Sequence, residues 1–457
     1  MVSYGARCAA LADTLHRSHN YEVELYIADK QRNPLNAKIA KVHQVIPDLN
    51  VQQICDLAVK HQQSIDFGIV GAEGPIIDGV RDLIEREAGI PFICPTKDSA
   101  IERSKVEQRL LLSETVPEVN PRFQIFDPKQ YPPPNKASEA AKKWIAELGG
   151  VTKVVIKPDK PGYGKGVGVG GEHFLTTEEA MAHLLSLFGG PTGQKVIIEE
   201  KVEGEESSFQ TWCDGKSLVA MPETRDYKRA FDGDIGPNTG GMGSYRSEED
   251  YLPFMTRSDW ETEIEIATKI FHRLRESGEG SSLRGTPFYI AFIHTAGTPK
   301  ILEINSRPGD PEIMAVLPTL EDDFVDICFG MVNGTLKKPS FRREAAVLTY
   351  AVPLTYGGYR EHYTGSSVVN LEQVYKLAEA HESRLRVYPG SIELKDNLTY
   401  TLKSRTVGVL GIGKSIEEAR DTSLKGVRHI DGPLWNRWDI ASERHIAYCK
   451  EHMKRLR

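Results

Sequence analysis

The chain has 457 residues, enough for two to four domains, and its 40% hydrophobic and 26% charged residues are typical of a globular protein. Its 57 basic and 64 acidic side chains give a net charge of −7, which argues against a non-specific nucleic-acid binder but leaves room for a local basic pocket. No run approaches the ~18 apolar residues of a membrane helix, and no signal-peptide pattern opens the chain. We therefore expect a cytoplasmic protein without nucleic-acid or membrane partners.

The cysteines lie far apart in the sequence and form no CxxC pair. They are Cys8, Cys55, Cys94, Cys213, Cys328 and Cys449. We expect buried free thiols rather than a structural zinc site or a disulfide framework.

The first hundred residues alternate helical and strand patterns. Helices are expected at 8–18, 51–62 and 80–89, and strands at 23–28, 65–71 and 90–94. Such alternation indicates a Rossmann-like parallel sheet covered on both faces. A strand before Gly5 has only four residues to build it, so either that strand is very short or the sequence begins inside the natural chain.

The middle of the chain mixes longer helices with hairpins. A Pro-rich passage at 126–138 is expected to cross the surface. Helices are expected at 138–150, 176–190 and 258–277, and strands at 153–158, 167–171 and 195–202, with hairpins turning at Asp214-Gly215 and spanning 288–307. Residues 232–243, rich in Gly, Asp and Asn, should form an ordered functional loop. A smaller mixed region follows, with strands at 345–353, 398–403 and 407–413 and a helix at 415–430.

The strongest local signal is KPDKPGYGKGVGV, residues 157–169. Its glycines, Gly162, Gly164, Gly166 and Gly168, let backbone amides approach an anion. Lys157 at the end of one strand and Lys165 in the loop could both meet a polyphosphate. The GxxxxGK[ST] spacing of a P-loop is absent, and the loop connects two strands, which disfavours a dinucleotide-binding loop. By itself the segment fits an ordinary flexible hairpin equally well.

Two further segments carry acidic residues at strand ends. In KILEINSR, Glu303 and Asn305 alternate onto one strand face, and oxygen ligands of this kind suit Mg²⁺ together with nucleotide phosphates. Arg307, Asp310 and Glu312 follow in a stiff RPGDPE loop that suits an anionic substrate. In IIEEKVEGEE, residues 197–206, the chain could read an adenine edge and a carboxylate could take the ribose hydroxyls. Alone, each segment would more often be a solvated acidic strand end.

The combination of these segments, in this order, resembles the ATP-grasp superfamily, in which two α+β lobes clamp ATP. The segments DYKRAFDGDIGPNTGGMGSY and SRPGDPEIM further resemble signatures of the phosphoribosylamine–glycine ligase family. The resemblance covers nearly the whole chain. It implies ATP-dependent ligation of glycine to 5-phosphoribosylamine through glycyl phosphate, a step of purine biosynthesis, with Mg²⁺ or alternatively Mn²⁺, in a monomer or small homo-oligomer.

The resemblance also implies an arrangement of domains. These are an N-terminal Rossmann-like (pre-ATP-grasp) domain at 1–104, an ATP-grasp core at 105–342 with a small lid at about 123–195, and a C-terminal mixed α/β domain at 343–457. The fold class expected is thus α/β and α+β, in several domains.

Roles carry over residue by residue. The expected ATP ligands are Lys105, Lys157, Lys165, Gly164, Gly166, Glu199, Glu200, Val202 and Glu206, with Glu205 as the alternative to Glu206 at the ribose, and the metal ligands are Glu303 and Asn305. The reaction centre is expected to contain Arg307, Asp310 and Asp226. The substrate residues expected are Gly5, Arg7, Glu73, Lys228, Arg229, Asn238 and Thr239, with the amine's phosphate at the helix N-terminus beside Gly5.

The departures from the family fall mostly at the amine end. Residues 5–10 read GARCAA where the family usually has GGREHA, so Cys8 and Ala9 replace a Glu-His pair. Tyr227 stands where a histidine is common, and Pro308 replaces a phenylalanine. Two alternatives therefore stay open. One is an ATP-grasp ligase that uses a different amine, and the other is a non-catalytic ATP-binding module.

Overall fold

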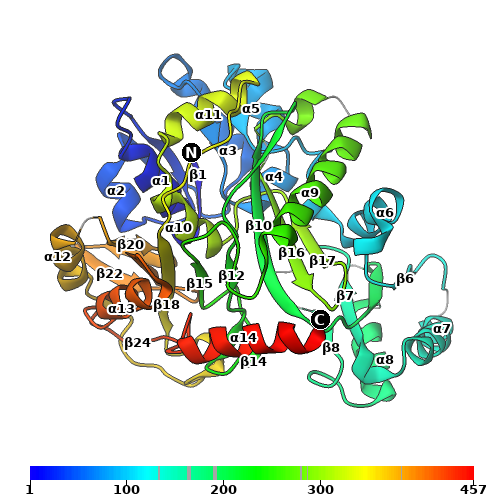
Figure 1. Ribbon diagram of the computed structural model, residues 1–457. Helices are drawn as coiled ribbons and strands as arrows, with labels where there is room; N and C mark the ends of the chain where they lie inside the picture. Colours follow the sequence, from blue (N-terminus) through cyan, green and yellow to red (C-terminus); the bar gives the residue numbers. More distant parts are fainter. Residues whose placement is uncertain (132–133, 162–165, 189–192, 278–279, 286, 382) are drawn as a thin grey trace. The chain divides into compact units, whose positions relative to one another are not determined.

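Figure 1 shows the computed structural model of the chain, which describes residues 1–457 except 132–133, 162–165, 189–192, 278–279, 286 and 382. The helices are α1 Gly5–His16, α2 Pro34–Ile39, α3 Val51–Lys60, α4 Glu73–Ile77, α5 Val80–Ala88, α6 Lys105–Thr115, α7 Pro134–Glu147, α8 Thr177–Phe188, α9 Arg257–Ser277, α10 Glu312–Val316, α11 Phe324–Asn333, α12 Glu372–Ala380, α13 Ile416–Val427 and α14 Glu443–Leu456.

The strands up to the second hairpin are β1 Val2–Ser3, β2 Tyr26–Asp29, β3 Val42–Val45, β4 Gly68–Ile69, β5 Phe92–Ile93, β6 Phe123–Phe126, β7 Val154–Pro158, β8 Gly168–Val169, β9 Val196–Glu200, β10 Glu205–Cys213, β11 Leu218–Ala220, β12 Arg225–Asp226, β13 Arg229–Phe231, β14 Ile235–Asn238, β15 Gly243–Arg246, β16 Phe288–His294 and β17 Lys300–Asn305. The later strands are β18 Ala345–Pro353, β19 Val368–Val369, β20 Leu385–Pro389, β21 Ile392–Lys395, β22 Leu398–Thr401, β23 Val407–Gly413 and β24 Leu434–Trp435.

The chain forms two compact units that are discontinuous in sequence. Unit 1 contains Met1–Ala100, Ser207–Tyr289 and Asn305–Glu451. Unit 2 contains Ile101–Glu206, Ile290–Ile304 and His452–Arg457. A four-stranded sheet has the order β11-β10-β16-β17.

The N-terminal part of unit 1 contains the parallel sheet predicted from the sequence. Strands pair in the order β1-β2-β3, with Val2 opposite Ala28, and Val2 also bridges Val70 in parallel. Helices α3 and α5 pack against each other, and the shared core includes Ile84 and Phe92. The strand before Gly5 forms as the two-residue β1. The expected α/β character of this region is confirmed.

Local sequence signals fix several helix ends. The Asn50 side chain caps α3 by accepting bonds from the backbone amides of Gln52 and Gln53. Helix α5 ends at Gly89, whose φ of 67° is the left-handed conformation that glycine adopts without strain. Helix α13 begins after Ser415, whose hydroxyl accepts from the amide of Glu418.

The C-terminal part of unit 1 is built on an antiparallel sheet in the order β12-β15-β18-β23-β20, with β24 added to β18. Helix α13 packs on β18 and β23. A Cβ at Gly411 would lie 2.0 Å from the carbonyl oxygen of Ala419, so this close approach of helix and strand requires glycine. The strands and helix expected after residue 345 are therefore largely confirmed.

Unit 2 contains a second antiparallel sheet, in the order β6-β9-β7-β8. Helices α7 and α8 lie side by side (Figure 1) and bury Ile145 and Leu184 against Ile156 and Ile198 of the sheet. Strand β9 lies between β6 and β7, so residues of β9 reach both neighbours.

Two expectations about local structure need correction, and one helix was not predicted. Helix α7 begins at Pro134, inside the passage expected to cross the surface, because proline suits the first turn of a helix. Residues 232–243 are not a loop throughout, since β14 pairs there with β13. Helix α14 was not expected, although Ile446, Cys449 and Met453 recur at helical spacing.

The cysteines are buried free thiols, as expected. Within the described part of the chain, no helix combines the length and apolarity needed to cross a membrane.

Candidate nucleotide and substrate sites

In unit 2, Lys157 lies near the end of β7 and is largely buried. Its Nζ lies 2.7 Å from Glu199 Oε2 on β9 and donates a hydrogen bond to the backbone carbonyl of Leu302 on β17. Burial lowers the pKa of Lys157 below its usual range, although Glu199 and Glu303 act in the opposite direction. The lysine predicted to meet the ATP phosphates thus lies beside the strand that carries the predicted metal ligands.

Glu199 is also paired with Arg109 of α6, a residue that the sequence motifs did not single out. Arg109 makes a two-pronged contact with the Glu199 carboxylate, at 2.6 and 3.0 Å, and both side chains are almost fully buried. Burial alone would raise the pKa of Glu199, but Arg109 and Lys157 bring it down to about 2. The carboxylate of Glu199 therefore stays ionised and orients Lys157.

Helix α6 also fixes the backbone of β17. Arg109 donates to the carbonyls of Ile301 and Leu302, at 2.9 and 2.8 Å. Gln108 both donates to the carbonyl of Ile304 and accepts from its amide, each at 2.9 Å. The strand that presents Glu303 is therefore bonded to the helix on both sides of that residue.

Lys105, the other lysine predicted to bind phosphate within the described residues, is the first residue of α6. Its amide donates to the carbonyl of Asp159, two residues after Lys157, and the Asp159 carboxylate accepts from Ser104 Oγ and the amide of Val106. These bonds attach the start of α6 to the end of β7. The two predicted phosphate lysines consequently stand on backbone segments that are directly bonded.

The predicted adenosine segment runs from β9 to the start of β10. The Glu200 carboxylate accepts a 2.9 Å hydrogen bond from the amide of Arg122. Val202 and Glu206 are half-buried, on either side of the start of β10. The Glu199 side chain is bonded to Arg109 and Lys157, and its backbone lies in the sheet opposite Phe123 and Val155.

Glu303 and Asn305 project from the same face of β17, as their spacing predicts. Glu303 is half-buried and Asn305 buried. Among the described residues no group of three or more His, Cys, Asp or Glu could hold a metal ion by itself. One carboxylate and one amide oxygen do fit Mg²⁺ when nucleotide phosphates complete the oxygen shell.

Part of the glycine-rich segment lies outside the described residues, including Gly162, Gly164 and Lys165. Gly166 is described and has a φ of 83°, and its carbonyl lies 2.9 Å from His183 Nε2. Gly166 therefore adopts a left-handed backbone conformation, which glycine takes without strain.

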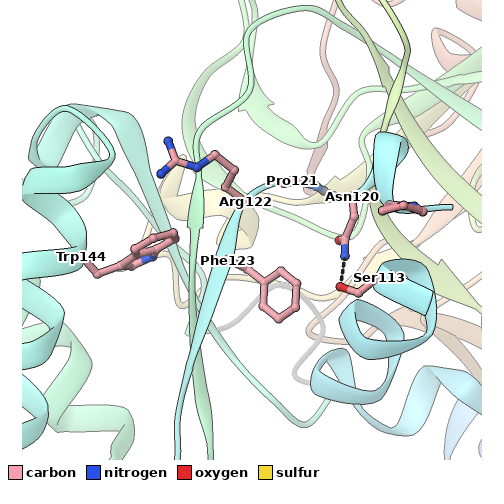
Figure 2. A pocket seen from close by; sticks show the side chains of 7 residues that line it. Ser113, Asn120, Pro121, Arg122, Phe123 and Trp144 are labelled. Carbon is pink, nitrogen blue, oxygen red and sulfur yellow. Dashed lines mark hydrogen bonds between the residues drawn. The ribbon is translucent and has the colours of Figure 1, made fainter. Parts of the chain in front are cut away.

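Figure 2 shows a pocket in unit 2 with the aromatic side chains of Phe123 and Trp144 and the guanidinium of Arg122 around it. The Arg122 guanidinium lies 5.4 Å from the Trp144 ring centroid, and the Trp144 indole donates to the carbonyl of Ile198. Across the described residues that line it, the pocket includes none of the predicted nucleotide ligands. Two of its residues contact β9, because Phe123 of β6 pairs with Glu199 and Trp144 bonds to Ile198.

Unit 1 gathers several predicted substrate residues around Glu73, the first residue of α4. Arg7 Nη2 lies 3.5 Å and Arg307 Nε 3.2 Å from the Glu73 carboxylate, and Arg7 also donates to the carbonyl of Pro308. Burial alone would raise the pKa of Glu73, but the two arginines hold it well below its usual range. Ion pairs to Glu73 thus join three segments that are distant in the sequence: α1, α4 and the loop after β17.

Asp310 lies beside the start of α1 and is held by two residues that the motifs did not include. Its Oδ1 accepts a 2.7 Å bond from the Tyr350 hydroxyl and lies 3.0 Å from Arg405. A Cβ at Gly5 would lie 3.5 Å from Asp310 Oδ2. Burial alone would lower the pKa of Arg405, but Asp310 raises it above its usual range.

Arg405 also connects Asp310 to the predicted DYKR…GGMG segment. It donates to the carbonyls of Gly240 and Gly241, and its guanidinium lies over the Tyr350 ring at 4.7 Å. Gly241 has a φ of 101°, and a Cβ there would lie 2.4 Å from Asp226 Oδ1. Asp226, Gly241 and Asp310 therefore belong to one cluster.

The remaining predicted substrate residues lie on the β13–β14 hairpin. Arg229 pairs with Asn238, and both the amide and the hydroxyl of Thr239 donate to the carbonyl of Lys228. The Thr239 hydroxyl in turn accepts from the amide of Gly241, which joins the hairpin to the cluster around Asp226.

The residues that depart from the family pattern are buried. Cys8 and Ala9 are both 0% exposed, and Cys8 lies directly under Gly71, where a Cβ would come within 2.3 Å of its sulfur. Burial raises the pKa of the Cys8 thiol to about 11. The Tyr227 hydroxyl is bonded to His445 Nδ1 at 3.0 Å and to the amide of Ala441. Cys8, Ala9 and Tyr227 therefore lie in the interior of unit 1.

Comparisons with known proteins define the class. Residues 1–102 match the family profile described as "Phosphoribosylglycinamide synthetase, N domain", and residues 129–313 match "Phosphoribosylglycinamide synthetase, ATP-grasp (A) domain". The chain is thus an ATP-grasp enzyme, with Gly5, Arg7 and Glu73 inside the first match and Lys157, Glu199 and Glu303 inside the second.

Full-length relatives give the family. The chain is 34% identical over 462 residues to a phosphoribosylamine–glycine ligase of Thermococcus kodakarensis, covering 100% of this chain and 99% of the relative. It is 34% identical over 459 residues to that of Pyrococcus furiosus, covering 100% and 97%. The chain belongs to the phosphoribosylamine–glycine ligase family, as the resemblance predicted. The crystal structure of the Thermotoga maritima ligase shares the fold, with a TM-score of 0.73, 23% identity and coverage of 96% and 98%.

Proposed function

We propose that this chain joins glycine to 5-phosphoribosylamine at the expense of ATP and releases glycinamide ribonucleotide, ADP and phosphate. Membership of the family over the full length supports the proposal. The observation that carries it is the grouping in unit 2 of Lys105, Lys157 and Glu303 around directly bonded backbone segments. This grouping fits a triphosphate and a divalent metal ion.

The chemistry has two steps. A carboxylate oxygen of glycine attacks the γ-phosphorus of ATP, the bond to the β,γ-bridging oxygen breaks, and glycyl phosphate and ADP form. The amine nitrogen of phosphoribosylamine then attacks the glycyl carbonyl carbon, the bond to the phosphate oxygen breaks, and the new amide loses a proton. Negative charge moves through the phosphoryl group in the first step, so catalysis there is mainly positioning and electrostatic stabilisation.

On the ATP side, Lys105 and Lys157 would bind phosphate oxygens, together with Lys165, Gly164 and Gly166 of the glycine-rich loop. The adenosine part would lie against the segment from Glu199 and Glu200 through Val202 to Glu206. Glu303 and Asn305 would hold Mg²⁺, with Mn²⁺ as the alternative, and the ion would neutralise phosphate charge. Closure of the loop would keep water from the acyl phosphate.

On the amine side, Arg307, Asp310 and Asp226 would contact the reacting groups. Gly5 would offer the N-terminal amides of α1 to the substrate phosphate. Because Arg7 is bonded to Glu73 and Pro308, it would orient this loop. Lys228, Arg229, Asn238 and Thr239 would bind substrate from the hairpin.

The finer organisation is likewise proposed from the sequence resemblance. It comprises domains at 1–104, 105–342 and 343–457 with a lid at about 123–195, and a monomer or small homo-oligomer. A cytoplasmic location is proposed from the sequence patterns described first.

Changing Glu303 to glutamine should weaken metal use. The variant loses the charged ligand, so the Mg²⁺ concentration for half-maximal activity should rise by at least about tenfold. Titration of activity with Mg²⁺ at saturating ATP measures this. The matched control is Glu321→Gln at an exposed site, which should titrate as the wild type does. An unchanged Mg²⁺ titration for Glu303→Gln would remove Glu303 from the metal site.

The function is tested by phosphate release from ATP with Mg²⁺ and glycine, with and without freshly generated phosphoribosylamine. Release that needs both substrates, with glycinamide ribonucleotide detected by mass spectrometry, supports the proposal. Release with glycine alone, unaffected by phosphoribosylamine, would favour a different amine, consistent with the changed residues Cys8 and Ala9. ATP binding without any release would favour a non-catalytic module.

A further inference from the structure

The segment that connects β9 to β10 is bonded to the end of α14. His452 Nδ1 lies 2.6 Å from Glu205 Oε1, and His452 Nε2 lies 3.8 Å from Glu203 Oε1. The side chain of Glu205 is only 4% exposed and that of His452 16% exposed, whereas Glu203 is 74% exposed. The buried contact is therefore the one between His452 and Glu205, within unit 2.

The same segment is fixed at Gly204 by its backbone. A Cβ at Gly204 would lie 1.9 Å from the carbonyl oxygen of His294, at the end of β16. No other residue type fits this approach without moving one of the two backbones. The backbone of the segment is thus held at Gly204 by its contact with His294, and the side chain of the next residue, Glu205, is held by His452.

This arrangement controls where the next residue points. Glu205 is the first residue of β10, and successive side chains on a strand project to opposite faces. When His452 holds Glu205 on one face, Glu206 is directed to the other. Val202 and Glu206 belong to the segment proposed above to bind the adenosine part of ATP.

We infer that His452 is a positioning residue for nucleotide recognition, acting through Glu205 on the segment 201–206. This inference rests on the proposed function, because it assigns a support to the proposed adenosine site. The ligand class is an adenine nucleoside di- or triphosphate. The C-terminal helix thereby contributes to a site whose other residues come from the middle of the chain.

The test compares His452→Ala with His452→Asn in the full chain. In His452→Ala, the KM for ATP should rise and the affinity for ADP, measured calorimetrically, should fall by about tenfold or more, because a hydrogen bond to a charged group is lost. The kcat at saturating ATP should stay close to that of the wild type. His452→Asn places an amide donor near the position of Nδ1 and should recover most of the affinity. Lys450→Ala, at an exposed position of the same helix, is the control.

A second variant, on the other side of the same contact, keeps the test informative if His452→Ala fails to fold. Glu205→Gln keeps the size and one acceptor oxygen but removes the charge, and it should weaken ADP binding in the same direction. Wild-type KM and ADP affinity in both His452→Ala and Glu205→Gln would overturn the inference while leaving the function standing. Failure of the wild-type protein to bind ADP or use ATP would instead count against the proposed function.

Discussion

Replacing Lys157 with methionine is expected to lower kcat/KM for ATP by about a hundredfold to a thousandfold, the usual effect of removing one preorganised group from a charged transition state. The Lys157 amine is buried, and its contacts with Glu199 and Leu302 fix its position. A lysine at the surface would not bring its charge to the same place. Initial rates of phosphate release at varied ATP, with both other substrates saturating, measure the effect.

The control for this variant is Lys153→Met. Lys153 is exposed and lies just before the same strand, so its replacement removes a positive charge without touching the buried cluster. A Lys157→Met enzyme with a rate near that of Lys153→Met would show that Lys157 has a structural role only.

Replacing Arg109 with methionine is expected to reduce the free energy of unfolding by about 3–5 kcal/mol, the range for breaking a buried ion pair from one side. Glu199 would keep Lys157 but lose both bonds from the guanidinium, and the carbonyls of Ile301 and Leu302 would lose theirs. Urea unfolding at neutral pH measures the change. The free energy of unfolding of Arg109→Lys should lie between those of the wild type and Arg109→Met, since an ammonium cannot reproduce the two-pronged contact.

The same pair predicts a pH dependence and a double-variant result. The folded pKa of Glu199, about 2, lies below its ordinary 4.5, so its stabilisation is complete above 4.5 and is lost as pH falls toward 2. Arg109→Met together with Glu199→Met should lose less stability than the sum of the two single variants, because each single change already removes the contact between the two side chains. Additive losses in the double variant would contradict the charge-pair explanation.

Much of the fold could be predicted from the sequence because the signals for its helices and strands are local. The alternation of the first hundred residues gives the parallel sheet, and Gly89 and Ser415 mark helix ends through their own backbone and side-chain chemistry. The apolar spacing of helix α14 is a usable sequence signal for that helix. The composition of the Asp232–Gly243 region predicts a loop because Gly, Asp and Asn also occur in the tight turn of the β13–β14 hairpin.

The supports of the candidate sites could not be predicted in the same way. Arg109 and Glu199 are 90 residues apart, and Asp310 and Arg405 are 95 apart. Nothing in the neighbourhood of either arginine says which carboxylate it meets, since the pairing is decided by how strands and helices pack. The motifs therefore supplied the groups that we propose to touch ligands, whereas the residues that orient these groups appeared only in the structure.

The most direct test of the account follows the oxygen atoms of glycine. With glycine labelled with ¹⁸O at both carboxylate positions, ATP, Mg²⁺ and phosphoribosylamine, the account predicts that each phosphate released carries one ¹⁸O and that the amide product keeps the other. This result requires a bond between the glycine carboxylate and the γ-phosphorus. Unlabelled phosphate, released together with the amide product, would contradict the glycyl phosphate intermediate and with it the central claim.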